Sequence, residues 1–119
     1  MKSVRDFLAG KLRRAETTSL TLALDGPPHP ALGAFEATLE SARGRVDFYA
    51  RGLLSGEHTL AYADIERVEL SPLEGALRLV DVRTAAGTAR LACSDEGGRV
   101  IHAALRWVGH TLLRRRIAD

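Results

Sequence analysis

The most reactive side chain in this sequence is its single cysteine. Cys93 ends a segment of alternating residues just before a predicted helix, a position where a thiol pKa can fall and give a reactive thiolate. The same alternation places Cys93 on one face with Ala89 and Leu91. Because cysteine behaves as a small apolar residue inside proteins, we expect a buried thiol rather than a nucleophile.

The four histidines do not have the spacing of a metal site. His102 and His110 lie eight residues apart in a predicted helix, near Arg99 and Arg106 rather than near acidic or sulfur ligands. Zinc requires three or four ligands that converge. We therefore expect histidines on the surface, with no metal and no cofactor.

Motifs for nucleophilic catalysis and nucleotide binding are absent from the sequence. Ser55 lies in Gly-Leu-Leu-Ser-Gly, which fails the Gly-x-Ser-x-Gly spacing of hydrolases. Neither Gly-x-Gly-x-x-Gly nor a Walker motif occurs. Strand alternation places most of the central acidic residues outward, which favours solvated carboxylates over general acids; they are Asp47, Asp64, Glu66, Glu69 and Asp81. We expect no catalytic residues and no enzymatic activity.

A cationic ridge is predicted on the long C-terminal helix, opposite its apolar side and next to an aromatic residue. Basic residues beside an aromatic ring can bind nucleic-acid backbone or an anionic lipid surface. The alternative, which we favour, is that the arginines solvate the outer face while the ring of Trp107 covers the rim of the domain. The candidate residues for a partner or an anion are Arg99, Arg106, Trp107, His110, Arg114, Arg115 and Arg116.

Length and composition favour one compact domain. The chain has 119 residues, of which 45% are hydrophobic and 27% charged, which suffices for a core without disulfides or a structural metal. One cysteine excludes an intramolecular disulfide. No apolar run approaches the ~18 residues of a membrane span, and Asp6, Gly10 and Lys11 interrupt any signal-peptide core. We expect a cytoplasmic protein.

Positive charge collects at both ends of the chain. Residues 1–15 contain five Lys or Arg and one Asp, and residues 99–119 contain five Arg and one Asp. Each end therefore carries +4, and since the total is +2, the middle carries −6. This distribution indicates either an anionic partner for the ends or attraction between the ends and the body. Without Asn or Gln, the chain has no side-chain amide for the bidentate recognition of adenine.

An amphipathic helix is predicted from about Val4 to Ala15. Ser3 and Asp6 have the spacing of a capping box. We expect the helix to pack on its own domain or on a second subunit, with attachment to a membrane surface as the alternative. It forms an N-terminal segment, residues 1–18, ahead of a main domain, residues 19–119. The candidate interaction residues are Val4, Phe7, Leu8, Lys11 and Leu12.

The main domain is predicted to be mainly β with a C-terminal helix. Three prolines make residues 26–30 a loop, and Gly52–Gly56 is predicted to be a turn. The apolar residues Ile101, Leu105, Val108 and Leu112 recur with helical spacing in the last segment. The seven predicted strands fall near residues 19–26, 35–40, 45–51, 57–62, 65–70, 76–82 and 88–93.

Seven short strands before one long amphipathic helix resemble the pleckstrin-homology-like (PH-like) barrel, including its small bacterial members. His58–Leu70 is similar to the family's apolar strand, Asp-Ile corner and following strand, and Gly75–Leu79 is similar to its glycine-led strand. The resemblance covers roughly residues 19–116. It implies sheets of four and three antiparallel strands, with the apolar side of the C-terminal helix plugging one end of the barrel.

The resemblance also implies a binding domain rather than an enzyme. Many members of the family hold phosphorylated lipid head groups with basic residues on the first hairpin, but residues 25–33 contain no Lys or Arg, and Glu36 and Glu40 follow. Carboxylates would repel a phosphate, so no head-group ligand is assigned.

We expect a non-catalytic binding or scaffolding domain that engages a protein partner or itself, through the N-terminal helix or an exposed sheet edge. The alternative is electrostatic attachment to an anionic membrane or a nucleic acid through the basic ends. A third hypothesis is that the barrel binds an apolar ligand in its interior.

Overall fold

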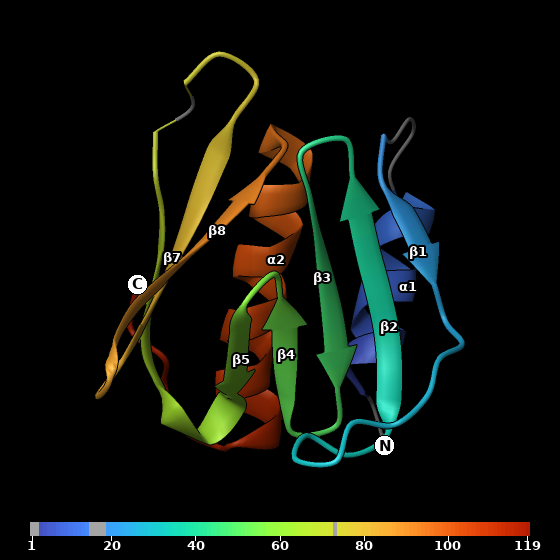
Figure 1. Cartoon of the computed structure of the whole chain (residues 1–119), viewed down its shortest axis with the longest axis vertical. Helices are drawn as coiled ribbons and strands as arrows, with labels where there is room; N and C mark the ends of the chain where they lie inside the picture. The colour runs from blue at the N-terminus through green and yellow to red at the C-terminus, as the bar shows by residue number, and fades with distance from the viewer. Residues whose placement is uncertain (1–2, 15–18, 73) are drawn as a thin grey trace.

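The computed structural model describes residues 3–14, 19–72 and 74–119. The protein is mainly β, with two antiparallel sheets, a short N-terminal helix and a longer helix near the C-terminus (Figure 1). In chain order the elements are α1 (Val4–Arg14), β1 (Thr21–Ala23), β2 (Phe35–Ser41), β3 (Gly44–Tyr49), β4 (Gly52–Ser55), β5 (His58–Ala61), the 3-10 turn η1 (Tyr62–Asp64), β6 (Ile65–Leu70), β7 (Arg78–Thr84), β8 (Gly87–Cys93), α2 (Asp95–Trp107) and the π-helical turn η2 (Val108–Leu112).

Helix α1 begins where the sequence predicts. The Ser3 hydroxyl accepts a hydrogen bond from the Asp6 N–H at 3.2 Å, and the Asp6 carboxylate accepts one from the Ser3 N–H at 3.3 Å. This reciprocal pair is a capping box. Val4 and Leu8 are fully buried, and α1 packs against α2, β2 and β3. The helix therefore shares one core with the sheets, while Ala15 and the predicted boundary at residues 18 and 19 involve residues outside the described ones.

The five-stranded sheet contains a strand that the sequence does not predict. Its order is β1-β2-β3-β4-β5 with antiparallel neighbours. The predicted turn at Gly52–Gly56 is wrong, because Gly52–Ser55 is strand β4 and Leu53 is fully buried. A Cβ at Gly52 would collide with the carbonyl oxygen of Leu60, so this glycine allows close strand pairing instead of a turn. The described residues thus form eight strands, not seven.

The two sheets do not close into a barrel, which corrects that expectation. The second sheet has the order β6-β7-β8, and the division is five and three strands rather than four and three. The sheets approach where β8 passes the start of β3, because a Cβ at Gly44 would collide with the carbonyl oxygen of Ala92. Beyond this crossing β8 diverges from the β4–β5 hairpin (Figure 1). With four residues each, β4 and β5 are too short to pair along β8.

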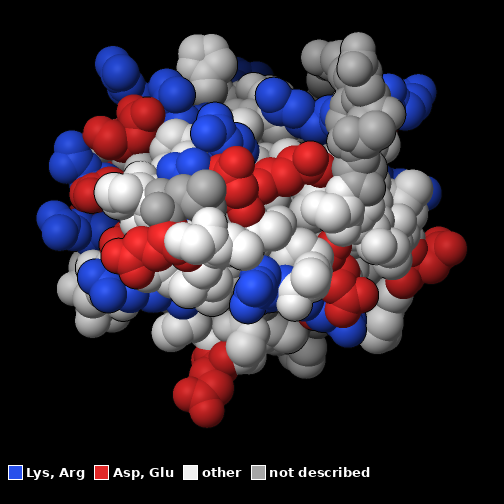
Figure 2. Space-filling model, turned by 90° about the horizontal axis from the view of Figure 1, so that it is seen from above, with Lys and Arg blue, Asp and Glu red and all other residues white. Residues whose placement is uncertain are grey.

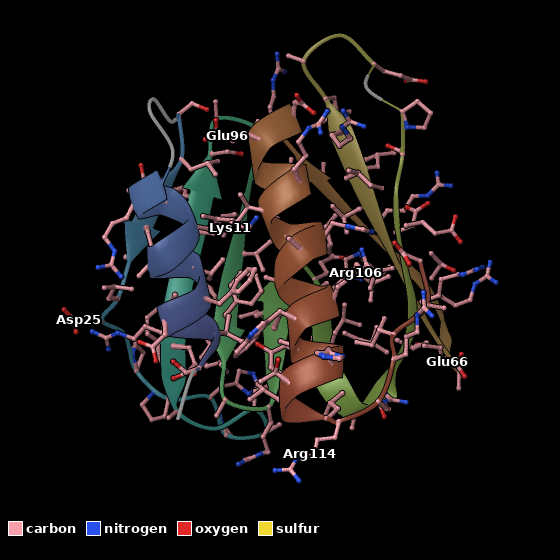
Figure 3. The ribbon with its side chains drawn as sticks, turned by 180° about the vertical axis from the view of Figure 1, so that it is seen from behind. Lys11, Asp25, Glu66, Glu96, Arg106 and Arg114 are labelled. Atoms are coloured by element: carbon pink, nitrogen blue, oxygen red, sulfur yellow. The ribbon has the colours of Figure 1, made fainter. Side chains whose placement is uncertain are left out.

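The predicted apolar side of α2 is confirmed. The Ser94 hydroxyl accepts a hydrogen bond from the Gly97 N–H at 3.1 Å and caps the helix. Ile101, Leu105 and Val108 are buried, and α2 packs mainly against the three-stranded sheet. Helix α1 lies beside it on the same side of the molecule (Figure 3). The core therefore lies between the two sheets and this pair of helices.

The C-terminal helix ends earlier than predicted. After α2, the backbone widens into the π-helical turn η2, and Arg114 adopts a left-handed conformation with φ of 50°. The expectation of a helix reaching Arg114–Arg116 is therefore wrong. A Cβ at Gly109 would lie 2.6 Å from Ile117 Cγ1, so the glycine lets Ile117 fold back against the helix. Burial of Ile117 outweighs further helical turns, which would carry three adjacent like charges.

Candidate binding surfaces

The predicted cationic ridge is divided into separate environments by the fold. Arg99 Nε lies 3.1 Å from Asp95 Oδ1, one helical turn away. Arg106 Nη1 lies 3.4 Å from Asp119 Oδ2. Arg106 projects from the side of α2 that faces away from α1, and Arg114 lies at the lower end of the molecule (Figure 3). The ridge is therefore not one continuous basic stripe, because two of its arginines are already paired with carboxylates.

Arg115 is part of the internal structure rather than an open cation. Its guanidinium donates hydrogen bonds to the carbonyl oxygens of Tyr62 at 3.4 Å, Ala63 at 2.6 Å and Ile65 at 2.9 Å. These carbonyls belong to the turn between the two sheets. A planar fork of donors suits this cluster of acceptors, so Arg115 fastens the end of the C-terminal helical region to that turn.

Four of the candidate residues meet at one hollow near the end of α2. Arg106, Trp107, His110 and Arg116 line a hollow of about 490 Å³ together with Ile117. The Trp107 ring is half-buried and stacks on the ring of Phe7. His110 and Arg116 are exposed. This hollow, here called the helix-end hollow, places two arginines beside an aromatic residue, a combination that can bind an anionic backbone.

The opposite end of the molecule has a mixed charge. Figure 2 shows basic and acidic side chains intermingled on the face that includes the start of α2. Arg78 and Arg99 both contact the Asp95 carboxylate there, at 2.6 Å and 3.1 Å. The hydrogen bonds from Arg78 and Arg99 lower the pKa of Asp95. Paired charges of both signs do not favour an anionic surface as a partner on this face.

The predicted interaction face of α1 is used within the chain. Val4 and Leu8 are fully buried, and Phe7 and Leu12 are half-buried against the core. Lys11 is exposed, with Nζ 6.0 Å from the centroid of the Phe7 ring. The apolar side of α1 is therefore covered by its own domain, and Lys11 is the candidate residue that it presents to solvent.

A second hollow lies where β8 diverges from the β4–β5 hairpin. It measures about 600 Å³, and its lining includes Gly44, Ser55, His58 and Arg90. The carbonyl of Ala92 faces Gly44 on β3, away from β7. Because backbone groups alternate along a strand, the N–H and C=O of Arg90 and of Thr88 also point away from β7. The free edge of β8 therefore forms one wall of this hollow.

Two arginines around the β8 edge, Arg45 and Arg90, are paired with carboxylates. Arg45 Nε lies 3.1 Å from Asp47 Oδ1, which also accepts a hydrogen bond from the Thr38 hydroxyl at 2.6 Å. Arg90 Nε lies 3.2 Å from Asp81 Oδ1. Asp47 and Asp81 are therefore only partly solvated, unlike the sequence expectation. Because Arg45 and Arg90 are paired, the edge of β8 offers mainly backbone hydrogen bonding.

Cys93 is buried, as the sequence predicts. Its side chain is 2% exposed, and the thiol donates a hydrogen bond to the Leu91 carbonyl at 3.4 Å. Burial raises its pKa to about 11. The group is therefore a buried, neutral thiol at physiological pH.

The histidines are spread over separate elements. Among the residues that the structure describes, no three His, Cys, Asp or Glu side chains gather as a metal site. His29 Nδ1 accepts hydrogen bonds from the N–H groups of Ala31 at 3.0 Å and Leu32 at 3.2 Å. This local role in the proline-containing loop was not predicted. His58 and His110 are exposed, whereas His29 and His102 are half-buried.

Comparison with known protein families, with curated proteins and with solved structures found no match to this chain. The PH-like resemblance therefore stays a prediction that rests on the order of strands and helices. Within the described ranges, none of the helices has both the length and the apolar character needed to cross a membrane.

Proposed function

We propose that this protein is a non-catalytic binding module that engages a protein partner, or a second copy of itself, through the free edge of β8. The observation that carries this proposal is the outward backbone of Thr88 and Arg90 beside the hollow at the β4–β5 hairpin. An extended segment can join such an edge as an additional strand, with affinity from main-chain hydrogen bonds. Pairing of the β8 edge would also cover backbone groups that otherwise favour non-specific association.

We further propose that the protein is a PH-like domain with open sheets. Two antiparallel sheets followed by a helix that packs on the second sheet support this placement. The open arrangement differs from a closed barrel at the side where β8 leaves the β4–β5 hairpin, which is the side that presents the proposed edge. The N-terminal helix is a weaker candidate, since its apolar side is buried in the core.

A pair of substitutions at Arg90 tests the proposal. Arg90→Pro and Arg90→Ala both remove the ion pair with Asp81, but only proline removes the outward N–H. The ladder with β7 is kept in both, because the N–H of residue 90 faces away from that strand. The two variants therefore differ in edge pairing and share the loss of charge.

We expect Arg90→Pro to lose self-association or partner binding that the wild type and Arg90→Ala retain. Size-exclusion chromatography with light scattering measures the first, and affinity capture from the native host with the three baits measures the second. Circular dichroism and thermal melting verify that both variants fold. A monomeric wild type whose captured proteins are the same with all three baits would contradict the proposal.

A second candidate function is electrostatic attachment to an anionic membrane or a nucleic acid. The helix-end hollow favours it, because Arg116 and His110 line it together with Trp107 and Arg106. Binding of this kind weakens steeply as salt screens the charges. Titrations with anionic vesicles and with nucleic acid at low and moderate salt measure it.

The test requires that Arg115 be left in place, since it bonds to the internal turn. We expect the double variant Arg114→Ala and Arg116→Ala to weaken binding at low salt while the fold is kept. Replacement of Lys11 by Ala provides a comparison at the other basic end. Absence of binding by the wild type at low salt rules this function out.

A further inference from the structure

Residues 117–119 lie along the other edge of the three-stranded sheet, as a short strand beside β6. The Ala118 N–H donates to the Glu66 carbonyl at 3.2 Å, and the Val68 N–H donates to the Ala118 carbonyl at 2.9 Å. Ala118 and Arg67 form a parallel bridge. The edge of β6 therefore already pairs with residues 117–119, which lie in a groove between β6 and α2.

Each residue of this segment has a distinct environment. Ile117 is 3% exposed and packs against Gly109. Asp119 Oδ2 lies 3.4 Å from Arg106 Nη1 and 4.0 Å from His102 Nε2, while Arg67 Nη2 donates to the Asp119 carbonyl at 3.3 Å. The groove therefore offers an apolar slot, a backbone pairing position and a cationic end, in that order.

A hollow of about 420 Å³ adjoins the segment, with a lining that includes Arg67, Leu70, His102 and Asp119. Since the backbone groups of Glu66 and Val68 pair with Ala118, alternation places the Val68 carbonyl and the Leu70 N–H on the same edge. An extended segment that reaches these two groups can pair with them.

Release of the segment withdraws the Ile117 side chain from the core, but it breaks no pairing between the strands β6, β7 and β8. Arg115, just before it, stays fastened to the turn between the sheets through its contacts with Ala63 and Ile65. Two backbone hydrogen bonds, one apolar side chain, a hydrogen bond from Arg67 to the Asp119 carbonyl and a half-exposed ion pair hold the remainder. A segment held by so few interactions unfolds locally far more readily than the three-stranded sheet does.

We propose that the groove between β6 and α2 binds an extended segment of a protein partner with the sequence type aliphatic, small, acidic, and that residues 117–119 occupy it as an internal competitor. The chain's own segment defines this chemistry, and the cations of Arg67 and Arg106 complement the acidic position. A second copy would bring residues 117–119 of the same type, which in each copy are already paired with its own β6. A longer partner segment adds pairing at Leu70. This site is on the opposite edge from β8 and does not depend on the proposed function.

The test uses a synthetic peptide, Arg-Ile-Ala-Asp-Val-Thr, which repeats residues 116–119 and adds two strand-forming residues. The control peptide, Arg-Ile-Pro-Asp-Val-Thr, lacks the N–H that pairs with Glu66. The protein is the full chain, either wild type or Ala118→Pro, which removes the same N–H from the internal segment. Fluorescence polarisation gives affinities, and amide chemical shifts of Val68 and Leu70 locate the binding.

We expect Ala118→Pro to bind the first peptide about tenfold more tightly than the wild type does, and the control peptide about tenfold more weakly than the first. Arg90→Pro, at the β8 edge, should leave these affinities unchanged, so the two proposals can fail separately. Equal binding of both peptides, or no gain in a folded Ala118→Pro, overturns the proposal. So does a wild-type dimer that Ala118→Pro loses, since the occupant is then a second copy.

Hydrogen exchange of the wild-type protein supplies a test that needs no variant. Val68 donates to the releasable segment, whereas Val82 lies opposite Ala89 in the middle strand of the sheet. We expect the Val68 amide to exchange about tenfold faster or more than the Val82 amide. Equal protection would mean that residues 117–119 stay bound until the sheet itself opens, which overturns the role of internal competitor.

Discussion

The indole ring of Trp107 stacks on the phenyl ring of Phe7, with ring centroids 5.4 Å apart and planes inclined by 25°. The contact joins α1, at the start of the chain, to the last residue of α2. Trp107 also lines the helix-end hollow. The aromatic residue predicted for ligand binding is therefore held in place by the N-terminal helix, which packs beside α2.

Phe7→Ala removes one side of this stack. We expect the free energy of unfolding to fall by about 2 kcal/mol, because a half-buried ring and an aromatic pair are both lost. The protein has one tryptophan, so urea unfolding followed by fluorescence reports on the site directly, with native emission shifted to longer wavelength. Phe7→Leu should retain most of the stability. Unchanged emission in Phe7→Ala would show that the rings do not stack in solution.

The neighbouring arginines Arg114 and Arg115 should respond differently to substitution. Arg115→Ala leaves the carbonyls of Ala63 and Ile65 without their guanidinium donor, and we expect a loss of about 1.5 kcal/mol in chemical denaturation. Arg114→Gly should be neutral or stabilising by about 0.5 kcal/mol, since glycine adopts the left-handed conformation without steric cost. Losses of similar size in the two variants would argue against the Arg115 contacts.

Local patterns predicted the elements whose determinants are local. The capping residue Ser3 holds its helix as expected, and the alternation that buries Leu91 and Cys93 is observed. The same rules failed at Gly52, because a glycine that opens a turn and a glycine that admits a neighbouring carbonyl look alike in sequence. Its neighbour Leu60 is eight residues away, and only pairing reveals the contact.

The different environments of the three consecutive arginines, Arg114, Arg115 and Arg116, could be assigned only from the folded structure. Arg115 reaches carbonyls about fifty residues earlier in the chain, which no spacing rule connects to it. The position of Ala118 on β6 is equally non-local. A signal for that segment was present, however: Gly109 interrupts a helical stretch, and Ile117 is an isolated apolar residue after three cations. Together they fit a chain that folds back onto its own helix.

The ion pairs of Asp95 should make the stability of the folded protein depend on pH in the acidic range. Hydrogen bonds from Arg78 and Arg99 lower the pKa of this carboxyl in the folded protein, so its contribution is present above the unfolded pKa and is lost as pH falls through the folded pKa. We expect Asp95→Asn to lower the urea midpoint at pH 7, with the difference from wild type disappearing as the pH falls through the lowered pKa of Asp95. Arg99→Ala, which keeps the Arg78 contact, should show a smaller effect. A pH-independent difference would point to a loss of packing instead.

Cys93 should resist modification in the folded protein. Its pKa of about 11 leaves about one thiol in a thousand ionised at pH 8, and the side chain is 2% exposed. We therefore expect an aromatic disulfide reagent to react slowly in native buffer and rapidly in urea, with a rate ratio of at least about 100. The double variant Cys93→Ala with Thr88→Cys places a thiol on the exposed side of the same strand and should react quickly without urea. Rapid, stoichiometric modification of native wild type would mean that the end of β8 opens readily, and the buried thiol would then be a reporter of sheet opening rather than a fixed part of the core.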